Sequence, residues 1–180
     1  MSLSFLQRDS VRLAGVLAIA AVLAFLFRDG PDAAASAVRN PQARAAMPEI
    51  SAPDLEGHPW SLAGQRGSIV LVNFWASWCP PCRAETPGLV RISKEYRGRG
   101  IEIVGASMDD TAEPVRNFVA RYQVPYTVIR PDLRGGLASA IESLPTSFLV
   151  DRQGRVAKTY VGGVRETTLK KDLDWLLTEQ

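Results

Sequence analysis

The chain has 180 residues and a formal net charge of +2, with 46% hydrophobic and 22% charged residues. These values suggest one globular domain with an added apolar segment. The basic residues are scattered, and the one cluster, KEYRGRG at residues 94–100, is typical of a solvated helix end, so we expect no nucleic-acid binding. The two cysteines are too few for a disulfide-rich scaffold, which leaves them available for chemistry.

The amino terminus carries an apolar segment, Leu13 to Phe27, without a polar side chain. As a helix it would span about 22 Å, slightly less than the roughly 30 Å hydrocarbon core of a bilayer. Arg12 and Arg28 flank it and can reach the two interfaces. We therefore predict a transmembrane signal-anchor helix over residues 11–28, after a short tail of residues 1–10.

A cleaved signal peptide is the alternative, with a small-residue site ending at Ala37. Charged residues separate that site from the apolar segment, which favours the anchor. The arginines on the two sides do not decide the orientation, but the short tail and the signal-like layout favour export of the rest. Residues 29–47 are rich in Ala, Pro and Arg, and we expect a flexible tether there.

From residue 48 onward, apolar runs alternate with helical patterns. Residues 68–74 and 101–108 are apolar on both faces, as in central strands. Between them a helix is predicted from near Cys79 to about Arg97. The remaining expected elements are a short strand and a turn near Gly57, a helix at 109–124, a strand at 126–130, a hairpin at 146–163 and a helix at 165–179 with Leu169, Leu173, Leu176 and Leu177 inward. This order predicts an α/β fold with a central mixed sheet flanked by helices.

Both cysteines lie in NFWASWCPPCRAETP, residues 73–87, where the first central strand gives way to a helix. Cys79 would lie at or beside the helix N-cap, where free N–H groups and the helix dipole favour a thiolate and lower its pKa. Cys82, one turn later, would be more buried and would resolve a mixed disulfide. Pro80 and Pro81 suit the first helical turn, where a missing N–H costs nothing.

Two other interpretations of the cysteine pair are weaker. A structural zinc site needs four ligands, and the chain adds only His58, a surface residue by its context, so we predict no metal. A structural disulfide across two residues closes too small a loop to remove much unfolded-state entropy. The pair is therefore interpreted as a redox-active disulfide that needs no other cofactor.

These residues carry a resemblance to a known family. VLVNFWASWCPPC resembles the active-site strand and loop of the thioredoxin superfamily. CPPCRAETP and SLPTSFLVDRQGRV resemble its membrane-anchored, extracytoplasmic TlpA/ResA/CcmG-type branch of bacterial thiol:disulfide oxidoreductases. The resemblance covers about residues 48–180 and implies a thioredoxin-like domain there, with Cys79 as nucleophile and Cys82 as its partner.

The resemblance also implies a client-binding surface. Pro145 matches the cis-proline loop that faces the cysteines, and a cis bond there would present the backbone of Leu144 to an extended client segment. From the sequence alone, Pro145 could equally be an edge-strand proline. Trp75 and Trp78 would shape the surface or simply pack. The residues implied to bind clients are Trp78, Pro80, Pro81, Leu144, Pro145 and Thr146.

Asn73 departs from cytoplasmic thioredoxins, which have a buried Asp at this position. An amide cannot shuttle a proton, so that role must lie with another residue or with water. Glu85, in a Cys-x-x-Cys-x-x-Glu spacing that resembles ResA-like proteins, is the candidate residue. A partly buried carboxylate on the thiol face would have a raised pKa and could manage the Cys82 proton. The alternative is a solvent-facing helix residue. Pro87 is implied to kink the helix.

Residues 105–129 also resemble the AhpC/TSA-like region shared with peroxiredoxins. A peroxidase would carry a Thr three residues before a lone catalytic Cys. Here that position is Ala76, and Cys82 follows Cys79 closely. We therefore do not expect a peroxidase.

The resemblance implies a single-pass protein of the bacterial cytoplasmic (inner) membrane whose periplasmic domain reduces disulfides in partner proteins. The implied clients are apocytochrome c or proteins that assemble the copper site of cytochrome oxidase, and the implied electron donor is a membrane protein of the DsbD/CcdA type. A DsbA-like oxidase is the alternative, but the spacing between Cys82 and Pro145 leaves no room for a large helical insertion. A copper chaperone would be expected to have Cys-x-x-x-Cys and a distal His, which the chain lacks.

Overall fold

The computed structural model describes residues 37–109 and 111–179. The predicted tail and transmembrane helix, residues 1–28, lie outside the described residues. Within the described part of the chain, no helix is both long and apolar enough to cross a membrane.

A five-stranded sheet forms the centre of the described domain, with the strand order β5-β4-β3-β6-β7. Its strands are β3 (Ile69–Trp75), β4 (Ile101–Ser107), β5 (Thr127–Ile129), β6 (Thr146–Val150) and β7 (Val156–Val161). β4 is parallel to both β3 and β5, whereas β6 is antiparallel to both β3 and β7. The predicted central mixed sheet is thus confirmed.

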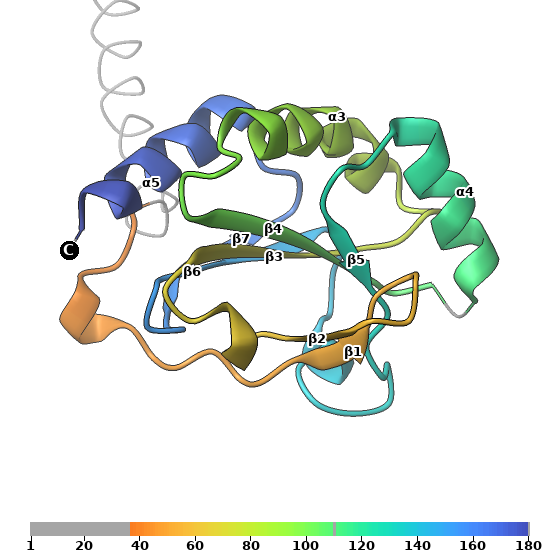
Figure 1. Ribbon diagram of the computed structural model, residues 1–180, viewed down its shortest axis with the longest axis horizontal. Helices are drawn as coiled ribbons and strands as arrows, with labels where there is room; N and C mark the ends of the chain where they lie inside the picture. The colour runs from red at the N-terminus through yellow and green to blue at the C-terminus, as the bar shows by residue number, and fades with distance from the viewer. Residues whose placement is uncertain (1–36, 110, 180) are drawn as a thin grey trace, which may run out of the picture. The chain divides into compact units, whose positions relative to one another are not determined.

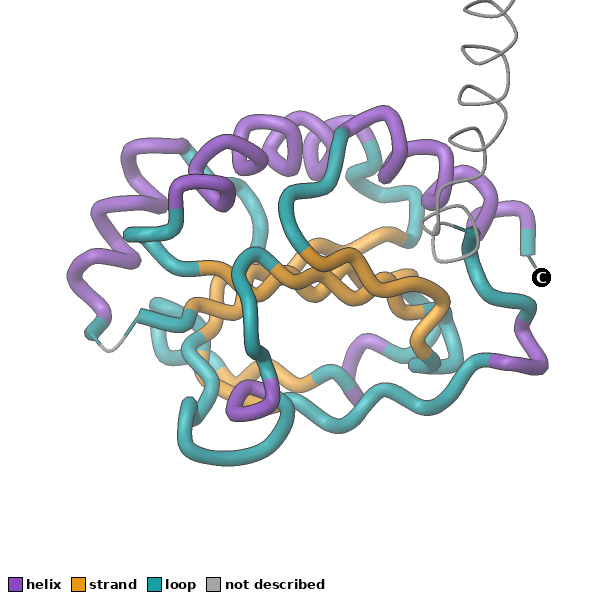
Figure 2. The backbone as a smooth tube through the Cα atoms, turned by 180° about the vertical axis from the view of Figure 1, so that it is seen from behind, coloured by secondary structure: helices purple, strands orange, loops and turns teal. Residues whose placement is uncertain are grey.

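The α-helices of the described residues pack on one face of this sheet. They are α3 (Pro80–Glu95), α4 (Ala112–Tyr122) and α5 (Glu166–Thr178), and α3 lies beside α5 (Figures 1 and 2). Because successive side chains of a strand point to opposite faces, Leu71, Asn73 and Trp75 of β3 all point toward these helices. The core between the sheet and α3 and α5 includes Ile69, Leu71, Leu89, Ile92, Ile103, Leu149, Leu169 and Leu173.

Shorter segments cover the opposite face. β1 (Ser51–Pro53) and β2 (Pro59–Ser61) form a small antiparallel hairpin, which lies below the sheet in Figure 1. The 3-10 helices η2 (Ala63–Gln65) and η3 (Ala138–Ala140) accompany it. The core on this side includes Met47, Ile50, Leu62, Val70, Val72, Phe74, Val104 and Ile129.

Residues 38–47 differ from the flexible tether predicted for residues 29–47. Arg44 is buried and forms ion pairs with Asp151, at 3.1 Å, and with Glu179, at 2.7 Å. Ala46 forms a β-bridge with Arg155, and η1 (Pro41–Ala43) precedes it. The compact unit therefore begins at residue 38 instead of 48. Composition did not reveal this, because the carboxylates that bind Arg44 lie 107 and 135 residues further along the chain.

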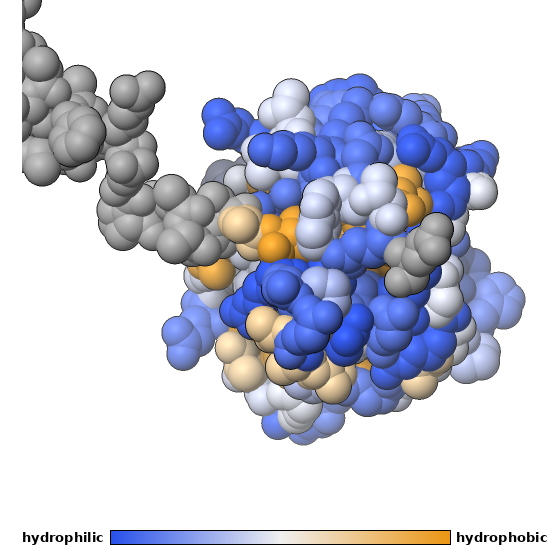
Figure 3. Space-filling view, turned by 90° about the vertical axis from the view of Figure 1, so that its left-hand side faces the viewer, coloured by the Kyte–Doolittle hydropathy of each residue, from blue (hydrophilic) through white to orange (hydrophobic). Residues whose placement is uncertain are grey.

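The C-terminal helix has the predicted apolar face with one polar exception. Leu169, Leu173 and Leu176 are buried. Asp172 is also buried and accepts hydrogen bonds from Lys158 Nζ, at 2.7 Å, and from the hydroxyl of Tyr160, at 2.6 Å. Figure 3 faces the end of the domain where the C-terminus lies, and its surface there is mainly hydrophilic.

Candidate active site

The sheet delivers the two cysteines to the start of a helix. β3 ends at Trp75, and Cys79 is the N-cap of α3, whose first residue is Pro80, as the sequence predicted. Cys79 and Cys82 form a disulfide with Cα atoms 5.3 Å apart, and both residues are buried. The backbone N–H of Cys82 points at Cys79 Sγ, at 3.3 Å. A thiolate at Cys79 would therefore receive an N–H donor and the positive end of the helix dipole.

A buried aspartate, Asp109, fixes the loop before the cysteines. It accepts hydrogen bonds from the backbone N–H and the hydroxyl of Ser77, at 2.9 and 2.6 Å. The hydroxyl of Ser107 at the end of β4 adds a third bond, at 3.0 Å. Sequence reasoning did not identify this contact, which joins the ends of two parallel strands.

The two tryptophans of the motif have different environments. Trp78 is 66% exposed beside Cys79, whereas Trp75 is buried and stacks on Phe118 with ring centroids 4.2 Å apart. A Cβ added at Gly105 would approach Trp75 Nε1 to 2.7 Å, so only glycine leaves room for this indole. Trp78 therefore shapes the surface at the cysteines, and Trp75 is a packing residue.

A groove of about 480 Å³ opens beside the disulfide. The Leu144–Pro145 peptide bond at its edge is cis, as the family resemblance implied. Thr146 lies outside this lining; it is buried, and its hydroxyl donates to the carbonyl of Ser143, at 2.8 Å. The residues that line the groove are Trp78, Cys79, Pro80, Pro81, Met108, Ile141, Glu142, Ser143 and Leu144.

Glu85 is partly buried, and two hydrogen-bond donors of the protein hold its carboxylate in place. Its Oε1 accepts a hydrogen bond from Asn73 Nδ2, at 2.9 Å, and its Oε2 accepts one from the backbone N–H of Val164, at 3.0 Å. Burial raises the pKa of the Glu85 carboxyl above its ordinary value, and the bonds from Val164 and Asn73 oppose this shift in part. A raised pKa makes the ionised carboxyl a stronger base than a free one, which suits it to accept a proton from a thiol.

Asn73 lies at the centre of the sheet and orients this carboxylate. Its neighbours in register are Gly105 on β4 and Ser147 on β6. Asn73 Nδ2 donates to Ser147 Oγ, at 2.9 Å, as well as to Glu85. The Asn73 amide stands where cytoplasmic thioredoxins have an aspartate. It acts here as a hydrogen-bond donor and cannot carry a proton. Ser147 was missed, although strand alternation from Pro145 would have placed it on the same face as Asn73.

A second groove, of about 470 Å³, reaches Glu85 from the outer surface of α3. It runs between α3 and the loop that leads from β7 to α5. Its lining includes Pro81, Ala84, Glu85, Gly88, Arg91, Gly163, Val164 and Glu166.

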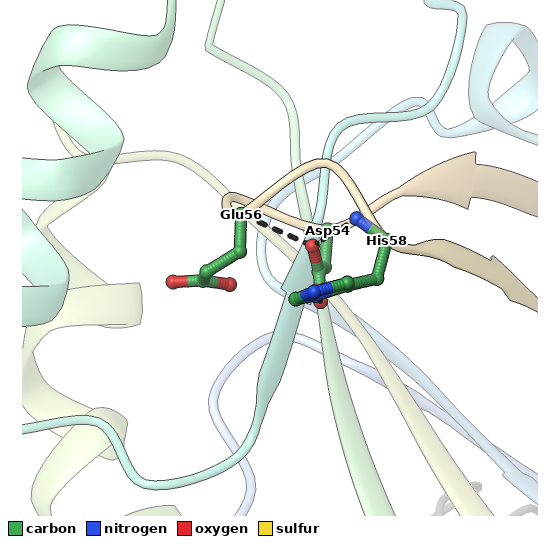
Figure 4. Close-up of side chains that lie close together, drawn as sticks. All are labelled: Asp54, Glu56 and His58. Atoms are coloured by element: carbon green, nitrogen blue, oxygen red, sulfur yellow. Dashed lines mark hydrogen bonds and ion pairs between the residues drawn. The ribbon is translucent and has the colours of Figure 1, made fainter.

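His58 is an exposed residue, as predicted, and its contacts explain its position. In the β1–β2 turn, Asp54 Oδ1 accepts the backbone N–H groups of Glu56 and His58, at 3.0 and 2.8 Å, and Asp54 Oδ2 lies 3.1 Å from His58 Nδ1 (Figure 4). The Asp54 carboxylate is thus already used by the turn itself. Glu56 and His58 are exposed and Asp54 is half-buried, and together they carry no argument for a bound metal.

Comparisons with known proteins agree with this site. The family model described as the AhpC/TSA family matches residues 43–159. HelX of Rhodobacter capsulatus, a thiol:disulfide interchange protein, is 39% identical over 113 residues, which are 62% of each chain, so the match spans less than two thirds of HelX. DsbE of Allochromatium vinosum, also a thiol:disulfide interchange protein, is 33% identical over 88% of this chain and 86% of its own. A solved thioredoxin-family thiol:disulfide interchange protein from Chlorobium tepidum superposes with a TM-score of 0.68 at 30% identity, covering 74% of this chain and 97% of its own.

A thioredoxin-like fold that carries a Cys79–Cys82 disulfide at a helix N-terminus defines a thiol:disulfide oxidoreductase. The resemblance seen in the sequence is confirmed. The chain belongs to the AhpC/TSA family, as an oxidoreductase of the HelX/DsbE type.

Proposed function

We propose that this protein is an extracytoplasmic reductase of disulfides in partner proteins. The observation that carries the proposal concerns Glu85, which lies on α3 together with Cys82. Its carboxyl is partly buried, has a raised pKa and accepts a hydrogen bond from Asn73 of β3. A reductase must activate its second thiol, and a carboxylate at this place can do so.

The reaction would proceed in two exchanges. The Cys79 thiolate attacks one sulfur of the client disulfide, forming a mixed disulfide and releasing the other client sulfur as a thiolate. Glu85 takes the proton of the Cys82 thiol, and the Cys82 thiolate attacks Cys79 Sγ. The second client sulfur leaves as a thiolate and takes a proton from solvent. The client gains two electrons, and the Cys79–Cys82 disulfide is formed.

The groove beside Trp78 and Leu144 supports binding of an extended client segment next to Cys79. By the family resemblance, we propose apocytochrome c or copper-site assembly proteins as clients. A membrane donor of the DsbD/CcdA type would reduce the Cys79–Cys82 disulfide again. We also propose that residues 11–28 anchor the chain in the bacterial inner membrane with the domain on the periplasmic side; carbonate extraction and protease protection of spheroplasts would test this.

Trapping tests the proposed chemistry directly. The Cys82→Ser variant of the full-length chain should accumulate a mixed disulfide with its client through Cys79, because no second thiol releases it. Cys79→Ser is the matched control and should trap nothing. The bound client is identified by mass spectrometry after reduction. Equal trapping by both variants would contradict the assigned roles, and a trapped client that the full enzyme oxidises would indicate a DsbA-like oxidase.

A further inference from the structure

The loop between β7 and α5 contacts both functional parts of the site. The backbone N–H of Gly162 donates to the carbonyl of Pro145, at 2.8 Å. Two residues later, the backbone N–H of Val164 donates to Glu85 Oε2, at 3.0 Å. One short segment thus binds the loop that borders the client groove and the carboxylate beneath α3.

The chain conformation at this loop fits such a role. Gly162 has φ of +86°, a value that disfavours any residue with a Cβ. At Gly163 an added Cβ would lie 3.8 Å from Glu85 Oε2 and 3.9 Å from the carbonyl oxygen of Pro81. The loop therefore runs directly along the carboxylate and the first turn of α3.

We propose that residues 162–164 are a positioning element that couples client docking at Pro145 to proton transfer by Glu85. A client segment that pairs beside Leu144 and Pro145 pulls on the Gly162 bond, and the displacement reaches Val164, whose N–H stabilises the charged form of Glu85. Loosening that bond makes the carboxylate a stronger base when the client is present. The inference rests on the proposed role of Glu85 in the reductase reaction.

The other groups around Glu85 provide no backbone link of this kind. Asn73, from β3, is a neutral donor that also bonds Ser147 of β6, so it connects Glu85 to the strand after Pro145 through two side chains. Tyr126, just before β5, has its pKa raised by burial and by Glu85, so it remains a neutral phenol. Arg91 and Glu166, in the second groove, form an ion pair with each other, at 2.7 Å, and Arg165 there is exposed. The Val164 N–H is the contact that joins Glu85 to the client side through the backbone of a loop and not through the central sheet.

Nuclear magnetic resonance of the reduced full-length chain in detergent tests the first link. The amide resonance of Val164 should titrate with a midpoint above 4.5, the ordinary value for this carboxyl, and the titration should vanish in Glu85→Gln. Glu113→Gln, an exposed acid on α4, is the control and should leave it unchanged. A Val164 amide that does not titrate in the wild-type chain would overturn the proposal.

The second link is tested in the Cys82→Ser variant, with Cys79 carrying either a methylthio cap or a disulfide-linked peptide of mainly apolar residues. The peptide should shift the Gly162 and Val164 amides and raise the Val164 midpoint by about half a unit to one unit relative to the cap, as expected for the weakening of one hydrogen bond to a charge. Identical midpoints in the two adducts would contradict the coupling.

Kinetics separate this inference from the proposed function. Val164→Pro removes the N–H, and Val164→Ala keeps it. The pH profile of the resolving step should move up by about one unit in the proline variant only. If Glu85→Gln leaves this profile unchanged, the proposed role of Glu85 fails. If Glu85→Gln changes it and the two Val164 variants behave alike, only the coupling fails. Should Val164→Pro not fold, the resonance measurements still decide.

Discussion

Asn73 donates a 2.9 Å hydrogen bond to Glu85, and this bond joins the central strand β3 to the helix that Cys79 caps and that contains Cys82. Asn73 is 2% exposed, so its amide must find acceptors inside the protein. Glu85 Oε1 and Ser147 Oγ are those acceptors. The arrangement keeps an ionisable, partly buried carboxyl at a fixed place beside the sheet.

Replacing Glu85 with Gln should slow the resolving step by roughly a hundredfold at pH 7, because general base catalysis typically contributes about 10²–10⁴. The first attack, by Cys79, should be nearly unchanged. Stopped-flow fluorescence of the exposed Trp78 beside Cys79 can follow both steps. Glu113→Gln is the matched control. A resolving step of normal rate and pH dependence in Glu85→Gln would remove the carboxyl from the mechanism.

An aspartate at position 73 should raise the pH midpoint of the resolving step. It would place a second carboxylate in hydrogen-bond contact with Glu85, and two adjacent carboxylates cannot ionise independently. The pair would then lose its second proton at a higher pH than Glu85 alone. Ser147→Ala, which leaves the bond between Asn73 and Glu85 in place, should shift the profile much less. A lower midpoint in Asn73→Asp would contradict the assigned geometry.

Truncation of Arg44 to Met should destabilise the domain by about 3 kcal/mol, because it leaves the buried Asp151 carboxylate without one of its cations. Arg39→Met, an exposed change in the same segment, should cost little. Urea unfolding with an unchanged slope measures both. If Arg44→Met lowers the free energy of unfolding by less than about 0.5 kcal/mol, the range of surface substitutions, then residues 38–47 do not stabilise the domain.

Acid should remove part of the stability that depends on Asp151. Hydrogen bonds from Arg155 and Arg44 outweigh burial and hold the pKa of Asp151 below its ordinary value of 3.8. Its contribution to the free energy of unfolding is therefore present above pH 3.8 and lost as the pH falls through the lowered pKa. Glu85 has the opposite sign: its raised pKa contributes stability below pH 4.5 that is lost as the pH rises through the raised value. The free energy of unfolding, measured by urea unfolding at each pH, should fall less steeply in acid for Asp151→Asn than for the wild type. For Glu85→Gln it should fall less steeply above pH 4.5.

Trp78→Ala should lower kcat/KM for a protein client by about tenfold, as expected for an exposed aromatic residue in a binding groove. The rate with a small disulfide should change little, because such a substrate does not fill the groove. Trp175→Ala is the control, because Trp175 is also exposed but lies on α5. Equal losses for protein and small substrates would place Trp78 in the chemistry instead of in client binding.

Local patterns in the sequence were sufficient for the parts of the fold that depend on neighbouring residues. The apolar run at Ile69–Trp75, the N-cap position of Cys79 and the hairpin that follows Pro145 all appear where the patterns placed them. Each depends on periodicity or on the preferences of proline at helix starts.

Contacts between distant residues could not be predicted in the same way. The bond from Val164 to Glu85 uses a backbone N–H, so no side chain at position 164 signals it. Asp172 lies on the inward face of α5 because Lys158 and Tyr160 from β7 bind it, which the helical pattern alone cannot show. Arg44 looked like part of a solvated tether because its two carboxylates come from the far end of the chain.

The reduction potential of the Cys79–Cys82 pair in the full-length chain tests the central claim most directly. Equilibration with dithiothreitol or glutathione, followed by alkylation, gives the value. A dedicated reductase should have a potential of about −220 mV or lower, toward the roughly −270 mV of thioredoxin. A value near about −120 mV, as in DsbA, would contradict the account and make the protein a donor of disulfides.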